Sequence, residues 1–258
     1  MGWLLIFPIA LSGLRSNIRY NKLMKAILDH TQDEAANIRT FFFKPERPIH
    51  YTAGQYAEWT LKHPEADDRG VSRWFTISSS PDDEFVTITT KYAGEGKTSS
   101  FKRALFEMQP GGEIQMSDPM GDFVLPILIQ TPLVFVAGGI GLTPFHSMAG
   151  WLTTHKEERP IKFLYGVRSE EEIIFQDTFE KAGIRPTIIV SEPSAAWGGE
   201  RGRLSAELIL GLEKPDENTL VYLSGPEVMV QTLAKDLHKA GLPKNQIVTD
   251  EFPNYEGI

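Results

Sequence analysis

A change in hydrophobic pattern near residue 130 limits the possible folds of this chain more than any other feature. Before it, short segments rich in Thr, Phe, Tyr, Val and Ile are bounded by Pro, Gly or Asp, as is typical of strands separated by turns. The clearest of these are residues 37–43, 55–61, 73–79 and 85–92. Apolar residues recur at helical spacing only over 101–108. This part therefore predicts a small antiparallel β-barrel.

After residue 130, expected strands and helices alternate. The expected strands are residues 133–137, 161–167, 187–191, 219–224 and 246–252. Helices are expected from Pro144 onward and over 170–182, 205–212 and 227–240. Such alternation predicts a parallel sheet covered on both faces. We therefore expect two domains: an antiparallel β-barrel at 21–128 and a doubly wound α/β domain with a parallel sheet at 129–258.

The chain opens with an arm, residues 1–20, whose residues 3–14 are an apolar run. As a helix this run would span about 18 Å, well short of a hydrocarbon core of about 30 Å. No basic segment precedes it, which argues against a signal peptide. Basic residues follow it, as they follow the cytoplasmic end of a membrane segment. We expect an arm packed on a cytoplasmic protein, with contact to the inner face of the membrane as the alternative.

Composition excludes several classes of function. The sequence has no cysteine, which excludes disulfides, thiolate-bound iron–sulfur clusters and thiolate zinc sites within this chain. The six histidines show no close ligand spacing, so no metal site is predicted. The net charge of −8 argues against a general nucleic-acid binder, which needs a basic face. Redox chemistry in this chain would therefore require an organic cofactor.

The first motif is Arg73-Trp74-Phe75-Thr76 on an expected strand. Strand alternation places Arg73 and Phe75 on one face and the other two residues on the opposite face. A guanidinium with a flat ring two residues later can hold a phosphate and support a planar heterocycle. An ordinary amphipathic strand with a surface arginine explains the motif equally well.

The second motif is the turn at 96–100, which opens the helix of the barrel domain. Free amides at a helix start, together with hydroxyl groups, form an anion site. The helix dipole contributes only about 0.3–1 kcal/mol, so tight phosphate binding would also need a cation such as Arg73. Ser99 or Ser100 also has a simpler role as a helix cap, and the two roles can coexist.

The third motif, residues 137–144 (AGGIGLTP), lies between a hydrophobic strand and a helix. Its glycines permit close approach of a pyrophosphate, and Pro144 suits the first turn of a helix. The second strand ends in Val167-Arg168, without the acidic ribose-binding residue of dehydrogenase-type Rossmann domains. This argues against a plain alcohol or hydroxy-acid dehydrogenase.

The order R-W-F-T, G-K-T-S, A-G-G-I-G-L-T-P, Y-L-S-G-P-E and a terminal D-E-F resembles the ferredoxin–NADP⁺ reductase family over about residues 22–258. It is similar in particular to the flavin reductase modules of bacterial membrane-associated oxidoreductases. The resemblance implies an FAD-dependent oxidoreductase that moves hydride from NADH or NADPH to flavin N5. Electrons then pass to an unidentified acceptor: a protein carrier, a quinone or a membrane partner. The alternative is a non-catalytic or partner-dependent electron-transfer subunit of a membrane complex.

The resemblance also implies roles for individual residues. Arg73 would contact the flavin diphosphate, Phe75 would stack on the isoalloxazine, and Thr76 would donate its hydroxyl to N5. The other residues assigned to the FAD side are Trp74, Lys91, Gly96, Lys97, Thr98, Ser99 and Ser100. Those assigned to the nicotinamide dinucleotide are Gly138, Gly139, Gly141, Thr143, Pro144, Arg168, Ser224, Gly225 and Pro226. Thr76, Ser224 and Glu251 are the expected catalytic residues, and Glu251 with Phe252 would close the other face of the flavin.

The sequence departs from the family pattern in three places. Phe75 replaces the usual tyrosine, and Ser224 replaces the usual cysteine. The tail continues past Phe252, which makes Tyr255 an alternative stacking ring. The choice between NADH and NADPH is left open, because Arg168 and Arg201 are candidate ligands of a 2′-phosphate whereas Glu192 would repel it.

Overall fold

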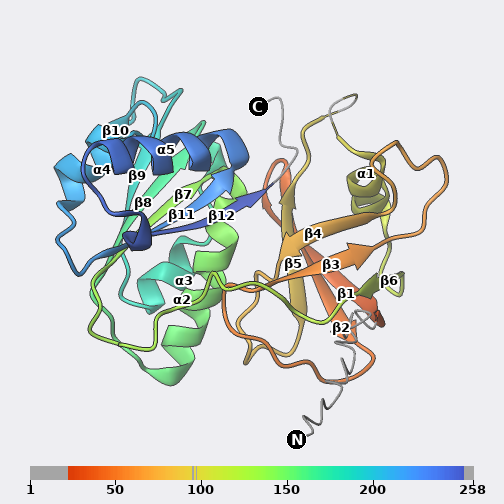
Figure 1. Ribbon diagram of the computed structural model, residues 1–258. Helices are drawn as coiled ribbons and strands as arrows, with labels where there is room; N and C mark the ends of the chain where they lie inside the picture. Colours follow the sequence, from red (N-terminus) through yellow and green to blue (C-terminus); the bar gives the residue numbers. More distant parts are fainter. Residues whose placement is uncertain (1–22, 95, 97, 253–258) are drawn as a thin grey trace, which may run out of the picture.

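The computed structural model describes residues 23–94, 96 and 98–252, which form two six-stranded sheets side by side (Figure 1). The predicted arm at 1–20, Lys97 and Tyr255 lie outside the described residues. Among the residues described, no helix is both long and apolar enough to cross a membrane. The first sheet is antiparallel and the second is parallel, which confirms the predicted fold class.

The first sheet has the strand order β4-β3-β6-β1-β2-β5. Its strands are β1 (Met24–Ala35), β2 (Ile38–Pro45), β3 (Tyr56–Thr60), β4 (Ser72–Thr76), β5 (Val86–Lys91) and β6 (Glu113–Met116). Just past β4, the Ser78 amide donates to the Thr87 carbonyl of β5 at 3.0 Å, so the two edges of the sheet meet. The sheet therefore closes around an aromatic core that includes Phe41, Phe43 and Trp59. Helix α1 (Ser100–Glu107) packs Phe101 and Leu105 into this core.

The second sheet has the order β10-β9-β8-β7-β11-β12. Its strands are β7 (Leu133–Gly138), β8 (Ile161–Val167), β9 (Pro186–Val190), β10 (Glu200–Arg201), β11 (Leu220–Pro226) and β12 (Ile247–Phe252). The chain enters at β7, builds outward to β10, and returns to the other side of β7 with β11. This reversal creates a switch point at the carboxyl ends of β7 and β11, where ligands of such sheets bind.

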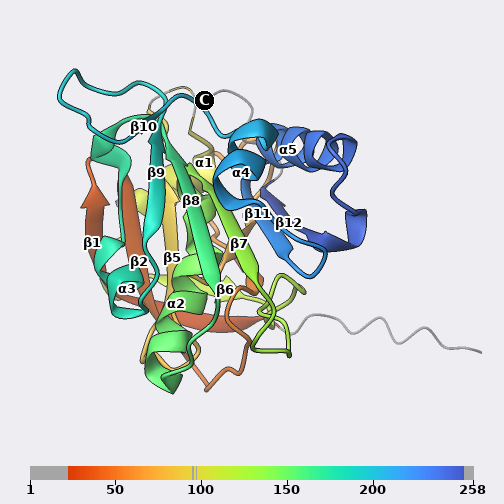
Figure 2. The same cartoon turned by 90° about the vertical axis from the view of Figure 1, so that its left-hand side faces the viewer.

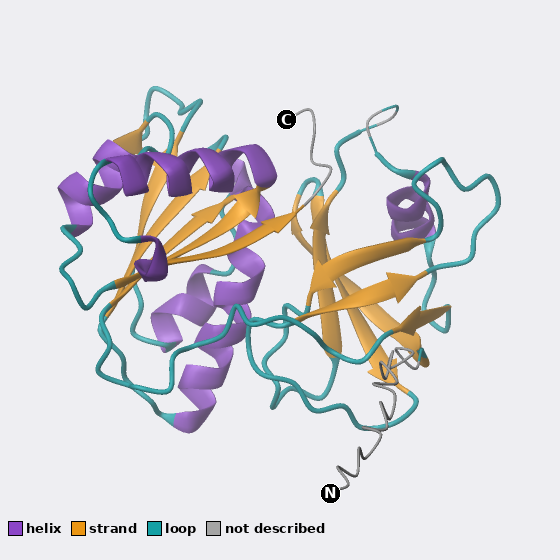
Figure 3. Cartoon of the chain, in the orientation of Figure 1, coloured by secondary structure: helices purple, strands orange, loops and turns teal. Residues whose placement is uncertain are grey.

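Helices cover both faces of the parallel sheet (Figures 1, 2 and 3). They are α2 (Thr143–His155), α3 (Gln176–Lys181), α4 (Ala206–Glu213) and α5 (Glu227–Lys239), with short 3₁₀ turns η1 (Gly139–Leu142), η2 (Glu170–Glu172) and η3 (Lys244–Gln246). Strand β7 is buried along its whole length because its side chains alternate between two cores. Phe135 faces the core containing α2 and α3, whereas Val134 and Val136 face the core containing α4 and α5.

The predicted helix over 170–182 is wrong. The segment forms η2, an extended stretch, and then the short helix α3. Phe175 adopts a left-handed φ of 61°, which interrupts a helix, and its ring stacks on His146 of α2 at 3.8 Å. Ile174 is buried in the core beside α2. Tertiary packing of these side chains therefore overrides the local helical pattern.

Helix α2 joins the two sheets directly. His146 Nδ1 donates to the Ser78 carbonyl at 2.7 Å and Ser147 Oγ donates to the Ser79 carbonyl. Within the first domain, Tyr51 Oη holds the same segment by donating to the Ser80 carbonyl at 2.8 Å. Burial lowers the pKa of His146 to about 4, so its ring is neutral and Nε2 accepts from Thr178. We call the contact of α2 with residues 78–80 the α2 seam. The α2 seam holds the segment just after β4, which ends at Thr76, against α2, which directly follows the Gly-rich turn η1.

Candidate functional site

Arg73 lies at the edge of the barrel with its guanidinium turned toward the loop that joins β3 to β4. Nη1 donates to the carbonyls of Arg69, Gly70 and Ser72, and Nη2 lies 3.3 Å from Asp67 Oδ1. The guanidinium carbon also sits 5.6 Å from the centre of the Phe101 ring. Burial lowers the pKa of Arg73, an effect that the nearby Asp67 opposes. The group is therefore half-buried and held in one orientation.

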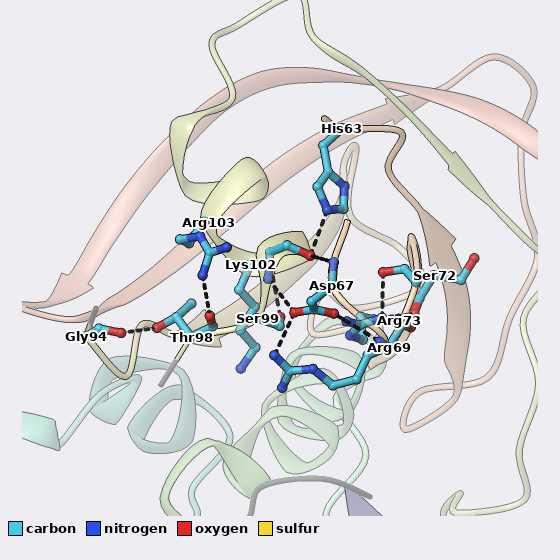
Figure 4. Close-up of polar contacts among 12 residues, drawn as sticks. His63, Asp67, Arg69, Ser72, Arg73, Gly94, Thr98, Ser99, Lys102 and Arg103 are labelled. Carbon is cyan, nitrogen blue, oxygen red and sulfur yellow. Dashed lines mark hydrogen bonds and ion pairs between the residues drawn. The ribbon is translucent and has the colours of Figure 1, made fainter. Parts of the chain in front are cut away.

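The start of helix α1 lies beside Arg73 (Figure 4). Ser99 caps the helix, since its hydroxyl accepts from the Lys102 amide at 3.2 Å. The Ser100 amide donates to Asp67 Oδ2 at 2.8 Å. The helix start and Arg73 thus bind the same carboxylate. We call Arg69, Arg73 and the Ser99–Ser100 backbone the diphosphate cradle, after the ligand that the sequence predicts at this position.

Thr76 ends β4 with a buried hydroxyl that has no hydrogen-bond partner in the described part of the chain. The two rings before it differ sharply in exposure. Phe75 is buried against Phe101 at 5.7 Å, whereas the side chain of Trp74 is 57% exposed and stacks on Tyr56 at 5.7 Å. The stacking role assigned to Phe75 and the cofactor contact assigned to Trp74 stay predictions.

The Gly-rich turn follows the carboxyl end of β7, at the switch point of the parallel sheet. Gly139 has a φ of 53°, and a Cβ at this position would meet no atom within 4 Å, so the turn is open on this side. Gly141 is packed tightly, because a Cβ there would lie 2.3 Å from the Ser224 carbonyl oxygen. The predicted residues Gly138, Gly139, Gly141, Thr143, Ser224 and Gly225 therefore lie together across β7, η1 and β11. The turn η1 also contacts β5 of the barrel, which places this group next to the first domain.

Ser224 is fully buried and donates to Oδ2 of Asp250 at 3.2 Å. Burial raises the pKa of Asp250 to about 6, although the Ser224 hydrogen bond opposes the shift. Glu251 is exposed, and its Oε1 lies 3.5 Å from Gln231 Nε2. The backbone of Phe252 pairs with Pro226, but its side chain is outside the described part of the structure.

Several predicted site residues have partners within the protein. Lys91 binds Glu172 of the second domain at 2.7 Å, and both side chains are largely buried. The Thr98 hydroxyl donates to the Gly94 carbonyl at 2.8 Å, which shapes the turn before α1. Arg168 pairs with Glu192 at 3.0 Å on the surface. The cofactor contacts assigned to these residues, to Gly96 and to Pro144 stay predictions.

Sequence reasoning missed three charged residues of the site: Asp67, Arg69 and Asp250. Asp67 and Arg69 lie in an exposed loop whose sequence, EADDRG, reads as solvated charge. Asp250 precedes the recognised acidic residue Glu251 on β12, and its burial depends on the neighbouring strand β11. The only available signal was a run of charges next to each motif, which is too common to be specific.

Comparison with known protein families agrees with this geometry. The sequence model of the oxidoreductase FAD-binding domain matches residues 25–125, and that of the oxidoreductase NAD-binding domain matches residues 135–235. The chain is 27% identical to NADH oxidoreductase HCR of Escherichia coli K12 over 195 residues, covering 75% of this chain and 58% of that protein. It is 30% identical to the reductase component of propane 2-monooxygenase of Mycolicibacterium smegmatis over 233 residues, covering 86% and 65%. The chain thus spans less than two thirds of these curated relatives.

Solved structures show the same fold. The FAD/NAD-binding domain of nitric oxide dioxygenase from Vibrio cholerae superposes with a TM-score of 0.75 at 21% identity, covering 89% of this chain and 98% of that one. A ferredoxin–NADP⁺ reductase from Neisseria gonorrhoeae, solved with bound FAD and NADP, gives 0.74 at 19% identity, covering 89% and 98%. With both domain families matched in the expected order, this chain belongs to the ferredoxin–NADP⁺ reductase family of FAD- and NAD-binding oxidoreductases.

Proposed function

We propose that the chain is a reductase module that uses FAD to take hydride from NADH and passes the electrons to a separate acceptor. The family supports the two cofactor classes, and the two halves of the site lie on the two sheets that would hold them. The diphosphate cradle belongs to the barrel, whereas the open Gly-rich turn belongs to the parallel sheet.

The single observation that carries the proposal is the buried Thr76 hydroxyl without a partner among the described residues. Leaving such a group unsatisfied costs about 1–3 kcal/mol. Trp59 and Thr90 also carry a buried atom without a described partner, but Thr76 is the one of the three on the strand of Arg73, and this position is what points to a ligand. Thr76 lies on the same strand as Arg73, three residues from the diphosphate cradle. A flavin whose diphosphate binds the cradle and whose ring accepts from Thr76 suits this arrangement, so the residues present fit FAD.

FAD supplies the redox chemistry itself, by accepting hydride from a reduced nicotinamide and releasing electrons to an acceptor. The protein residues bind and orient. Arg73 and the Ser100 amide hold a diphosphate, and the Thr76 hydroxyl offers a hydrogen bond at the ring. Gly139 leaves room for a dinucleotide backbone, and the buried Ser224 hydroxyl donates to Asp250 beside it. Holding two reactants in alignment is the main contribution expected of such a site.

We infer that NADH is the preferred donor. Arg168 follows β8 and is the nearest predicted cation for a 2′-phosphate, but Glu192 neutralises it at 3.0 Å. The second candidate, Arg201, donates to the carbonyls of Ser194 and Trp197. A 2′-phosphate would therefore meet the Glu192 carboxylate while both candidate guanidinium groups already bind other acceptors.

The acceptor is inferred to be a separate protein or domain. One matched relative is named as the reductase component of an oxygenase, and the present sequence has no cysteine to hold an iron–sulfur cluster itself. Membrane contact through residues 1–20 stays part of the proposal as an alternative to a surface arm.

Anaerobic mixing of the FAD-loaded protein with NADH or NADPH tests the proposed function. Rapid loss of the yellow flavin absorbance with NADH, and slower loss with NADPH, is the expected result. A flavoprotein that neither nucleotide bleaches would instead support the alternative of a partner-dependent electron-transfer subunit. A protein that binds no FAD would exclude both.

A further inference from the structure

The Asp67 carboxylate occupies the diphosphate cradle. Its Oδ2 accepts from the Ser100 amide at 2.8 Å and from Arg69 Nη2 at 2.7 Å. Its Oδ1 accepts from the Arg69 amide at 3.2 Å and lies 3.3 Å from Arg73 Nη2. Figure 4 shows these contacts converging on one side chain. A carboxylate of the chain itself therefore binds the first amide of α1 and both arginines.

These donors are the ones that a diphosphate would use. Amides at a helix start and guanidinium groups bind phosphate oxygens and carboxylate oxygens in the same way, through charge-assisted hydrogen bonds. One amide hydrogen cannot serve both acceptors at full strength. A diphosphate in the same place would also lie against a second negative charge, which the hydrogen bond from Arg69 keeps ionised by holding the pKa of Asp67 well below its usual range.

The segment that carries Asp67 is an irregular loop held mainly by side-chain contacts. Residues 62–71 join β3 to β4 with no regular secondary structure, and most of their side chains are exposed. His63 Nε2 lies 2.9 Å from Ser100 Oγ, which also accepts from the Asp67 amide at 2.9 Å, so the hydrogen bonds of His63 and Asp67 with α1 all end on Ser100. Arg73 holds the other end of the loop through the carbonyls of Arg69 and Gly70.

We propose that Asp67 is an internal anion that closes the diphosphate cradle in the flavin-free protein and that FAD must displace it to bind. This inference rests on the proposed FAD function and adds a control of cofactor loading. If only a fraction of the molecules has an open cradle at any time, the apparent affinity for FAD falls in proportion to that fraction. Asp67 would thus occupy the Ser100 amide and the two guanidinium groups until a diphosphate competes for them.

The first test compares FAD and riboflavin binding by the wild-type protein and Asp67→Asn, using quenching of flavin fluorescence. Riboflavin lacks the phosphates, so displacement of Asp67 predicts about tenfold tighter FAD binding by the variant and no change for riboflavin. Asp68→Asn is the matched control, because it removes the same charge from the adjacent exposed residue and should change FAD affinity far less. Equal or weaker FAD binding by Asp67→Asn would overturn the inference and make Asp67 a positioning residue for the arginines.

A second test uses the wild-type protein alone, so it does not depend on the variant folding. Trypsin can cut after Lys62 and Arg69 in the loop. Inorganic pyrophosphate is too small to cover the loop, and we expect it to accelerate cleavage at these two sites by releasing Asp67. Slower or unchanged cleavage at saturating pyrophosphate would count against displacement. If the wild-type protein bound no FAD, the proposed function itself would be overturned. If it bound FAD equally well with and without the Asp67 carboxylate, only the present inference would be overturned.

Discussion

The Ser224 hydroxyl donates to Asp250 Oδ2 at 3.2 Å, across the neighbouring strands β11 and β12. Burial is the main reason that the pKa of Asp250 rises from 3.8 to about 6, and the Glu251 charge adds to it. The pair lies directly behind the Gly-rich turn, because Gly141 packs on the Ser224 carbonyl. A titrating carboxyl therefore lies beside the predicted nicotinamide pocket.

Asp250→Asn should change how stability depends on pH. The folded pKa lies above that of the unfolded chain, so Asp250 stabilises the fold fully below about pH 4 and loses this contribution as pH rises through about 6. We expect the variant to exceed the wild-type protein by about 3 kcal/mol in free energy of unfolding above pH 6, with no difference near pH 4. Urea unfolding from pH 4 to 8 measures this. Asp236→Asn, at a partly exposed position of α5, is the control. A pH-independent difference would contradict the assignment.

Thr76→Val should have opposite effects on stability and on activity. The substitution removes a buried hydroxyl that no described residue satisfies, so the flavin-free protein should gain about 1 kcal/mol. Flavin reduction by NADH should slow about 10²-fold, because one donor at the reacting ring is lost. Thermal unfolding and anaerobic stopped-flow absorbance measure the two effects. Thr90→Val, which removes another buried hydroxyl without a described partner, should reproduce only the stability gain.

Gly141→Ala should be far more damaging than Gly139→Ala. The new methyl at 141 would lie 2.3 Å from a backbone oxygen that cannot move aside, and we expect a loss of about 3 kcal/mol or more. At 139 the space is open and only the left-handed φ is unfavourable, which costs about 1–2 kcal/mol. Chemical unfolding of the two variants gives the comparison. Equal losses would mean that the turn does not pack on β11 as described.

Glu192→Gln should shift nucleotide preference toward NADPH. The change removes the negative charge that neutralises Arg168 and would free its guanidinium for a 2′-phosphate. We expect KM for NADPH to fall about tenfold and kcat with NADH to stay within twofold, since one charge-assisted hydrogen bond is worth about 1.5 kcal/mol. Stability should hardly change, because exposed ion pairs contribute little. An unchanged ratio of the two nucleotides would remove Arg168 from the specificity site.

Lys91→Met should loosen the contact between the two domains. It removes one partner of the largely buried pair with Glu172 and leaves that carboxylate unpaired. We expect the free energy of unfolding to fall by about 1–3 kcal/mol. The double variant Lys91→Met with Glu172→Gln should recover most of this loss, because it leaves no unpaired carboxylate. The same variants decide the cofactor role predicted for Lys91. Weaker FAD binding by the double variant, whose stability is restored, would support that role.

The sequence was sufficient for features that depend on local pattern. Strand β8 is predicted at 161–167, where it lies, because these residues are mostly apolar and follow Pro160. The Gly-rich turn was recognised because both its strand and its helix were visible around it. The order of the motifs identified the family, which the matched domain families confirm.

Features that depend on contacts between distant residues could not be predicted. The helix predicted over 170–182 is interrupted at Phe175, whose ring stacks on His146, 29 residues earlier in the chain. Lys91 and Glu172 are 81 residues apart, and nothing local links them. The occupation of the cradle by Asp67 requires the loop to fold back on α1, although its charges read as solvated. In each case a tertiary contact decides the structure, and the local propensity of the residues does not indicate it.

The α2 seam has a consequence for the connector between the sheets, residues 117–132. Non-covalent contacts already bind one half of the molecule to the other, and this stretch adds to them by burying Phe123 against Phe145 and Tyr222. Ile127 on its surface is 97% exposed, which makes it an accessible place to cut. The two fragments of such a nicked protein would be expected to stay together and keep both nucleotide sites in register, as complementing pieces of one enzyme.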